Sequence, residues 1–179
     1  ALAVLTELGL ANPLASVTDA PGHSPGGCPG TRSMKFGARA PAPDGDIGRR
    51  PSQLTHWPVQ LHLISPQAPQ YAGRDVLLSA DCVAYALGDF HKDWLKGRTL
   101  AIACPKLDEG QETYTQKIRM LIDDAKITSL TVLTMEVPCC YGLLELAQEA
   151  AGQARRKIPI RHVTVGIQGD ILEDQTTAA

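Results

Sequence analysis

The chain has few aromatic residues, no long apolar run and no excess of basic residues, and each absence excludes a class of protein. Aromatics make up 4% of the 179 residues, so the core must be aliphatic, as in buried parallel strands rich in Val, Ile and Leu. No apolar run approaches the ~18–20 residues that a membrane span needs. The net charge is −2, and no basic stripe is present to neutralise the phosphates of a nucleic acid. We therefore expect neither a membrane span nor a nucleic-acid partner.

Several short motifs are also missing. The sequence contains no P-loop, no G-x-G-x-x-G, no G-x-S-x-G and no H-E-x-x-H, so nucleotide binding and serine hydrolysis lose support. The first residues, A-L-A-V-L-T-E-L-G-L, have no basic segment, and Glu7 interrupts their apolar run, which disfavours a signal peptide. The chain begins without methionine, which suggests a processed or truncated product with further sequence upstream.

Five cysteines are present, and none forms a short pair of the kind that structural zinc sites use. They are Cys28, Cys82, Cys104, Cys139 and Cys140. Zinc fingers and ribbons need C-x₂₋₄-C spacings because one tight turn supplies two ligands. An odd, small set in a chain of this length also disfavours a disulfide framework. A reducing cytoplasm, with reactive or metal-bound thiols, is the compartment we expect.

The composition divides the chain into three parts. Residues 1–53 are rich in Pro, Gly, Ser and Ala without a sustained hydrophobic period, which predicts an irregular N-terminal arm. Within it, Gly26-Gly27-Cys28-Pro29-Gly30 places a cysteine between residues that permit close backbone approach, and we expect Cys28 to be held against the folded domain. Residues 54–172 form the globular domain, and residues 173–179 are polar or small and are predicted to be a frayed tail.

Strand and helix patterns alternate along the globular part. The strands are predicted at Trp57–Ile64, Asp75–Ala80, Arg98–Ala103, Leu130–Val137 and Ile160–Ile167. The helices are predicted at Asp89–Leu95, Gln111–Lys126 and Tyr141–Ala154. With right-handed crossovers this alternation predicts an α/β fold, a three-layer sandwich around a mainly parallel sheet of about five strands.

Three of the predicted strands end in cysteine. Cys82 follows D-V-L-L-S-A-D, Cys104 follows R-T-L-A-I-A, and the third strand runs into Pro138-Cys139-Cys140 at the start of a helix. The carboxyl ends of parallel strands meet at one edge, where open α/β sheets bind ligands. About four thiolates hold a cubane iron–sulfur cluster, and Cys28, Cys82, Cys104 and one of the vicinal pair supply that number. Adjacent residues point to opposite sides, so we expect one of the pair, Cys139, to face the edge.

Two other interpretations stay open. The same cysteines suit a catalytic site, as a thiol redox pair or an open metal site acting on a small molecule, with Asp81 or His91 moving protons. A single cysteine at a strand end is more often core than ligand, so a metal-free interaction module is the third hypothesis. Softness of the thiolate also suits nickel, copper or zinc. The residues decide neither whether the chain is an enzyme nor its oligomeric state.

Phrases along the chain resemble a known family. They are G-C-P-G-T-R at 27–32, W-P-V-Q-L at 57–61, A-D-C-V at 80–83, D-F-H at 89–91, C-P-K-L-D at 104–108, M-E-V-P-C-C at 135–140 and G-I-Q-G-D-I at 166–171. In combination they resemble the C-terminal domain of 4Fe-4S ferredoxin-like iron–sulfur proteins of anaerobic bacteria and archaea. The resemblance implies an anaerobe's redox protein whose partner is another redox protein or an upstream ferredoxin module. The two-cluster segment with C-x₂-C-x₂-C runs that typically precedes this domain is absent here.

Overall fold

A computed structural model describes residues 34–35 and 50–177 of the chain. The main sheet of these residues has five strands in the order β4-β3-β5-β6-β7. The strands are β3 (Asp75–Ala80), β4 (Thr99–Ala103), β5 (Ser129–Met135), β6 (Ile160–Val165) and β7 (Ile171–Thr177). The first four are parallel, and β7 runs antiparallel to β6. The sheet is therefore mixed but mainly parallel, as predicted.

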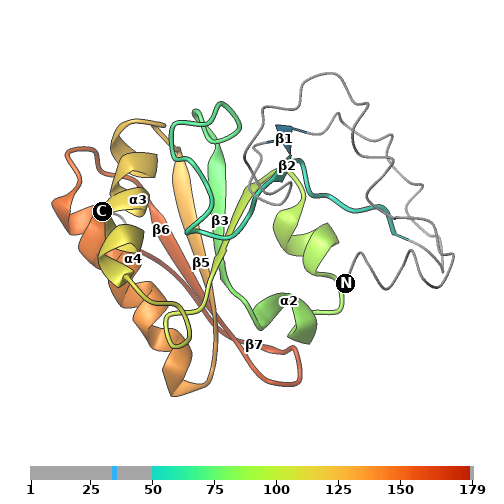
Figure 1. The fold of residues 1–179 in the computed structure, drawn as a ribbon. Coiled ribbons are helices and arrows are strands. Elements are labelled where there is room, and N and C mark those ends of the chain that lie inside the picture. Colours follow the sequence, from blue (N-terminus) through green and yellow to red (C-terminus); the bar gives the residue numbers. More distant parts are fainter. Residues whose placement is uncertain (1–33, 36–49, 178–179) are drawn as a thin grey trace, which may run out of the picture.

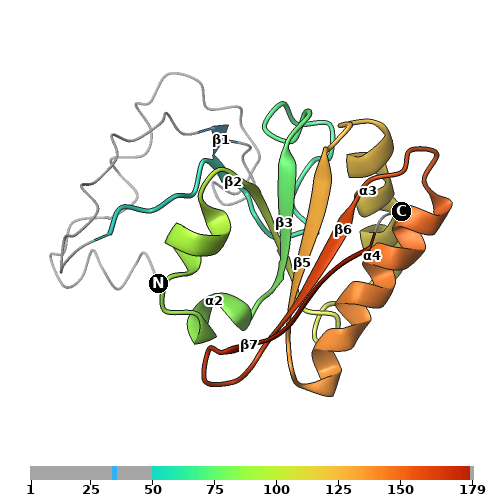
Figure 2. The same ribbon diagram turned by 180° about the vertical axis from the view of Figure 1, so that it is seen from behind.

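Helices cover both faces of this sheet (Figure 1). The long helices α3 (Gln111–Asp123) and α4 (Tyr141–Gln153) pack side by side on one face. The short helix α2 (Val83–Ala86) and the π-helical segment η3 (Phe90–Leu95) lie on the other, as the view from behind also shows (Figure 2). The predicted three-layer α/β sandwich is confirmed.

The order of the strands places a topological switch point at the centre of the sheet. From β3 the chain passes to β4 on one side, and from β4 it crosses back to β5 on the other side of β3. The connections after β3 and β5 therefore leave the sheet next to each other. In open α/β sheets the crevice between two such connections is where ligands bind.

One predicted strand is mostly absent. Within Trp57–Ile64 only Trp57 lies in a strand, β2 (His56–Trp57), which pairs antiparallel with β1 (Met34–Lys35). The chain then makes a single bridge from Gln60 to Ile102 of β4 and turns. Gln60 explains the turn, because its backbone carbonyl accepts from the amides of Leu63 and Ile64 and its side chain accepts from the amide of His62. Apolar alternation here reflects a turn with one side buried, not a continuous strand.

The fifth strand of the sheet comes from residues predicted to be a frayed tail. Residues 173–177 form most of β7, whose side chains are exposed on both faces. Exposure on both faces leaves no apolar alternation for the sequence to display. The strand is held by its ladder with β6 and by the paired charges of Arg161 and Asp174, 2.6 Å apart.

Each of the three predicted helical segments is helical in the structure. The apolar stripe of α3 is buried, with Tyr114, Ile118, Leu121 and Ile122 against the sheet. The segment predicted at Asp89–Leu95 is helical but π-helical, with the amide of Lys96 donating to the carbonyl of His91. The four-residue α2 was not predicted. No helix among the described residues is long and apolar enough to cross a membrane.

Polar side chains close the amino-terminal edge of the parallel strands. Asp75, at the start of β3, accepts hydrogen bonds from Thr128 and Ser129 at the start of β5. Asp123, at the end of α3, accepts from the backbone amides of Arg155 and Arg156, at 3.0 and 3.1 Å. These bonds tie the connections of this edge to one another.

A buried histidine anchors β2 to the amino-terminal half of β4. The Nε2 atom of His56 lies 2.9 Å from the carbonyl oxygen of Leu100 and 3.2 Å from the hydroxyl of Tyr71. Burial lowers the pKa of His56 below its usual value, against a smaller opposite effect of the Leu100 carbonyl. The histidine is therefore neutral in the folded protein at neutral pH.

Candidate metal centre

Two of the cysteine positions flank the switch point. Cys82 follows β3 and is the N-cap of α2, and its side chain is exposed. Cys139 and Cys140 follow β5 in a 3₁₀ turn (Pro138–Cys140) that leads directly into α4. Because β3 and β5 are adjacent and parallel, both connections rise from the same edge of the sheet.

The vicinal cysteines face different surroundings. Cys139 is exposed, whereas Cys140 is 5% exposed and belongs to the core. Burial raises the pKa of the Cys140 thiol, and neighbouring Cys139 and Cys82 raise it further, Cys139 also through a hydrogen bond, while a hydrogen bond with the backbone of Met135 lowers it. Cys82, Cys139 and Cys140 therefore lie on the two connections that flank the switch point, two exposed and one buried. The two cysteines of the pair therefore differ in exposure, with Cys139 at the surface and Cys140 in the core.

The third cysteine, Cys104, follows β4 on the far side of β3 and is half-buried. Its loop is organised by Asp108. The Asp108 carboxylate accepts from the Cys104 amide at 2.8 Å, from the Gln60 side chain at 3.0 Å and from the Tyr114 hydroxyl. Burial acts to raise the pKa of Asp108, but these three bonds outweigh it and hold the pKa below its usual value. No local pattern in the sequence marks Asp108 as a residue that accepts hydrogen bonds from three separate segments.

The Cys104 loop also contacts the start of α4. A Cβ atom at Gly142 would lie 3.3 Å from Cβ of Pro105, so a side chain at position 142 would move the two segments apart by a few tenths of an ångström. The side chain of Gln111 donates to the carbonyl of Pro105 at 2.6 Å and fixes the loop to the start of α3. The structure thus brings Cys104 to the same edge as Cys82 and Cys139, with loops in direct contact.

Asp81 and His91, the two residues considered for proton transfer, lie in different settings. One carboxylate oxygen of Asp81 is buried without a hydrogen-bond partner, and burial together with nearby Asp108 raises the pKa of Asp81. His91 is exposed, and its Nδ1 accepts from the amide of Gln53 at 3.1 Å. His91 therefore serves the junction at residues 50–53, where Arg50 also pairs with Asp89.

A single-ion site is not formed by the described residues alone. Among residues 50–177, no three His, Cys, Asp or Glu side chains are grouped closely enough to hold one metal ion. Cys28 lies outside the described residues. A cubane cluster is larger than one ion and takes four thiolates around its body. An edge that offers sulfur from three separate strand ends suits that shape, since each ligand stands on a rigid element.

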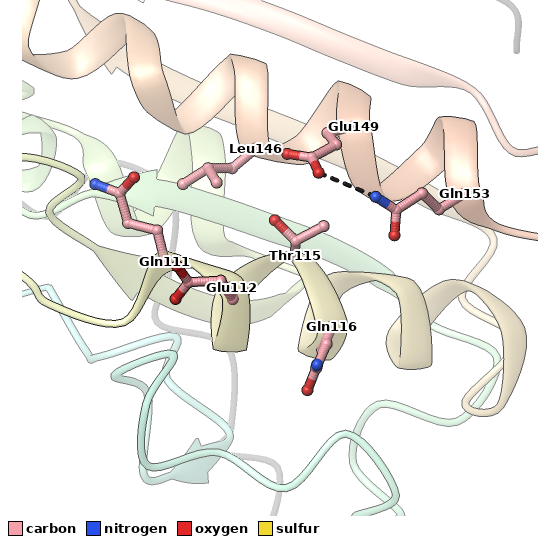
Figure 3. Close-up of a pocket in the computed structure, with 7 residues that line it drawn as sticks. All are labelled: Gln111, Glu112, Thr115, Gln116, Leu146, Glu149 and Gln153. Atoms are coloured by element: carbon pink, nitrogen blue, oxygen red, sulfur yellow. Dashed lines mark hydrogen bonds between the residues drawn. The ribbon is translucent and has the colours of Figure 1, made fainter.

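A groove between α3 and α4 lies apart from the cysteine positions. It has a volume of about 320 Å³ and a mostly polar lining (Figure 3). Glu149 and Gln153 hydrogen-bond to each other across one turn of α4 in this groove, at 3.0 Å. The lining residues are Gln111, Glu112, Thr115, Gln116, Leu146, Glu149 and Gln153. The groove contains no sulfur and no cluster of ligating side chains, and it does not share the chemistry of the cysteine edge.

Comparison with known proteins agrees with this architecture. The Rossmann-like domain family matches residues 68–179. This chain belongs to the Rossmann-like domain family. An uncharacterized protein of Archaeoglobus fulgidus is 29% identical over 121 residues, which cover 66% of this chain and 83% of that protein. No solved structure gives a significant match.

This Rossmann-like domain departs from dinucleotide-binding domains at the first strand–helix turn. Such domains place a glycine-rich G-x-G-x-x-G turn after the first strand to receive a pyrophosphate. Here that turn reads Asp81-Cys82-Val83-Ala84. The edge that holds a nucleotide phosphate in other members of this architecture holds thiols in this chain.

Proposed function

We propose that the chain is an iron–sulfur protein that transfers electrons, with a cluster held at the carboxyl edge of the sheet. The observation that carries the proposal is the placement of Cys82, Cys104 and Cys139 at the ends of three adjacent parallel strands. A bound cluster supplies one-electron reduction and oxidation. The residues of this chain supply the thiolates, and the backbone around them fixes their spacing.

The fourth thiolate in this proposal is Cys28, and the direction of the chain at β1 supports it. Residues 56–61 run beside β4 in the same direction, with the Leu61 amide donating to the Ile102 carbonyl at 2.8 Å. Because β1 is antiparallel to β2, Met34 is the end of β1 nearer the carboxyl end of β4, after which Cys104 follows. Cys28 precedes Met34 by six positions, and six positions of extended chain span at most about 20 Å.

The buried cysteine has a separate role in this proposal. Cys140 lies under Cys139 and beside Cys82 in the core, so it packs beneath the cluster and is not one of the four ligands. Its apolar surroundings also limit access of water to that side of the cluster. Burial and hydrogen bonds to cluster sulfur are among the factors that set reduction potentials.

The family resemblance supports one type of metal centre, a 4Fe-4S cluster. The combined phrases around the cysteines are similar to those of the 4Fe-4S ferredoxin-like iron–sulfur proteins of anaerobic bacteria and archaea, which favours a 4Fe-4S cluster over a single nickel, copper or zinc ion. The partner would be a separate redox protein or an upstream ferredoxin module. A reducing cytoplasm is the compartment in which such thiolates persist.

One observation favours a second function at the same edge. Cys139 and Cys140 are adjacent in the 3₁₀ turn that leads into α4, one exposed and one buried, and such a vicinal pair suits thiol redox chemistry on a small molecule. That candidate needs no metal. It is separated from the first by asking whether activity survives iron removal but not thiol alkylation.

The test is the metal and sulfide content of the full chain purified without oxygen. The protein should be brown, with iron and acid-labile sulfide in equal amounts, and elemental analysis identifies any other metal. Cys28→Ser, Cys82→Ser, Cys104→Ser and Cys139→Ser should each lose the cluster, and Cys140→Ala is the matched control that keeps it. Colourless protein without iron or sulfide after reconstitution would overturn the proposal.

A further inference from the structure

The most exposed large apolar side chains of the described residues lie at one edge of this domain, although Leu63, Ile171 and Leu172 are also exposed. The three most exposed are Tyr85, Leu107 and Ile167, at 93, 81 and 67%. They lie on the connections that follow β3, β4 and β6, and Tyr141 adds a fourth at the start of α4, after β5. One such side chain thus comes from each connection that leaves the carboxyl ends of the parallel strands. We refer to these four residues as the apolar ring.

The opposite edge differs. Among the described residues, the connections that enter the amino-terminal ends of the strands carry no exposed large apolar side chain. Monomeric proteins rarely gather such side chains in one place unless the place is used for binding. The ring surrounds the connections that carry Cys82, Cys104 and Cys139, so its position matches the redox site proposed above.

The two edges also differ in formal charge. The connections at the cysteine edge (81–88, 104–110, 136–140 and 166–170) contain five carboxylates and one lysine, a formal charge of −4. The connections at the other edge (72–74, 96–98, 124–128 and 154–159) contain seven basic residues and one aspartate, a formal charge of +6. The domain therefore has a strong charge asymmetry along the strand direction, which orients it in the field of a charged partner.

This pattern selects the kind of partner. Two copies meeting ring to ring would bring like charges together, and a nucleic acid or an anionic membrane surface would be repelled. A second copy offering its basic edge would meet the ring with a surface that has no large apolar side chains. A basic protein surface with an apolar centre satisfies both features, because interfaces combine an apolar core with a charged rim.

We propose that the apolar ring is the docking surface for an electron-transfer protein that presents a basic patch with an apolar centre. The inference rests on the proposed function. Encounters of this kind bury small areas and are transient, so four apolar side chains around the redox site are sufficient. Docking there would place the partner directly over the edge at which the cluster is proposed.

The test uses a basic c-type cytochrome as a probe, with the same cytochrome after succinylation of its lysines as control. The ¹⁵N-labelled full chain should show amide shifts at residues 83–86, 106–110, 139–142 and 166–170 with the basic probe and none with the succinylated one. Stopped-flow mixing of the reduced protein with the probe gives the rate constant of electron transfer. Shifts that map elsewhere overturn the proposal.

Variants separate the apolar contribution from the charge. Tyr85→Ser, Leu107→Ser and Ile167→Ser combined should lower the rate constant about tenfold, corresponding to ~1.4 kcal/mol, while Leu63→Ser, an exposed leucine outside the ring, leaves it unchanged. Glu109→Lys with Asp170→Lys should lower it at low salt only, and Asp124→Lys at the other edge should not. Sensitivity to charge without sensitivity to the apolar substitutions overturns the proposal.

The failure of docking and of cluster binding are distinguishable. Iron and sulfide are measured on every variant before mixing. Loaded protein that transfers electrons without ring-dependent shifts overturns the docking surface alone. Protein without iron overturns the cluster, and the amide-shift experiment still tests docking because it needs no electron transfer.

Discussion

The two edges of the sheet are the two ends of the same strands, but they differ in the hydrogen bonding and exposure of their side chains. At the amino-terminal edge, carboxylates such as Asp75 and Asp123 have hydrogen-bond donors from neighbouring connections. At the carboxyl edge, Asp81 keeps a buried oxygen without a partner, and Cys82 and Tyr85 are exposed. Sequences that specify one fold break local rules mainly where function requires it. The difference agrees with our proposal that the chemistry of this chain takes place at the carboxyl edge.

The largest expected effect is the complete loss of the cluster when the exposed thiols are replaced. The stability of the fold should not change. The double variant Cys82→Ser/Cys139→Ser should lose all bound iron and sulfide. The stability of its metal-free form should stay within ~0.5 kcal/mol of the parent, because surface substitutions change little. Urea unfolding of both metal-free proteins measures this. A large loss of stability would mean that the thiols are structural and would remove the contrast between the edges.

Equal truncations at the two edges should differ sharply in their effect on stability. Ile127, at the entrance to β5, is fully buried, and Ile127→Ala should lower the free energy of unfolding by about 3 kcal/mol through the cavity it leaves. Leu107→Ala, at the exposed edge, should change it by less than ~0.5 kcal/mol. Thermal or urea unfolding compares them. Similar losses in the two variants would contradict the comparison.

Acid should act through His56, beside the amino-terminal half of β4. Its folded-state pKa lies below the unfolded value of 6.5, so the unfolded chain binds the proton first as pH falls. Stability is therefore complete above about pH 6.5 and declines as pH falls toward the lowered pKa, by at most ~1.4 kcal/mol per pH unit for one proton.

The pH dependence of urea unfolding between about pH 5 and 7 tests this sign. His56→Gln should flatten the dependence, and adding His162→Gln should flatten it further, because burial also lowers the pKa of His162. An undiminished slope in the double variant would assign the acid sensitivity to other groups.

The smallest effect is expected at Asp123. Its carboxylate accepts from two backbone amides at the connection before β6, and Asp123→Ala should lower the free energy of unfolding by about 1 kcal/mol. Asp124, the next residue, forms an ion pair with Arg155 at 3.9 Å. Asp124→Ala is therefore the matched control, with a smaller effect expected. Iron content should be unchanged in both, since neither lies at the cysteine edge.

The parallel part of the fold was predictable because its signals are local. Continuous apolar runs before Cys82, Cys104 and Pro138 read as buried strands, and the spacing of three and four in α3 reads as a helix. The edge strand β7 was not predictable in the same way. Its residues face solvent on both sides, and only pairing with β6 makes them a strand, which is a contact between segments that a pattern along one segment does not encode.

The cysteine edge was predictable as a location but not in its supporting contacts. Strand ends of a parallel sheet must share an edge, so the meeting of Cys82 and Cys139 followed from the pattern. The role of Asp108 depends on Gln60 and Tyr114, which approach from distant segments. The sequence did not predict the apolar ring. The exposure of Tyr85 and Leu107 depends on how the whole domain packs, and a single apolar residue in a loop does not indicate it.

The contact between Gly142 and Pro105 sets the distance between two segments, the loop after β4 and the start of α4. A methyl group at position 142 would press on Pro105 and shift the segment that carries Cys104 by a few tenths of an ångström relative to the start of α4. Relatives of this chain should therefore change positions 105 and 142 together. In the laboratory, Gly142→Ala offers a way to retune the distance between two sulfur atoms without touching either cysteine.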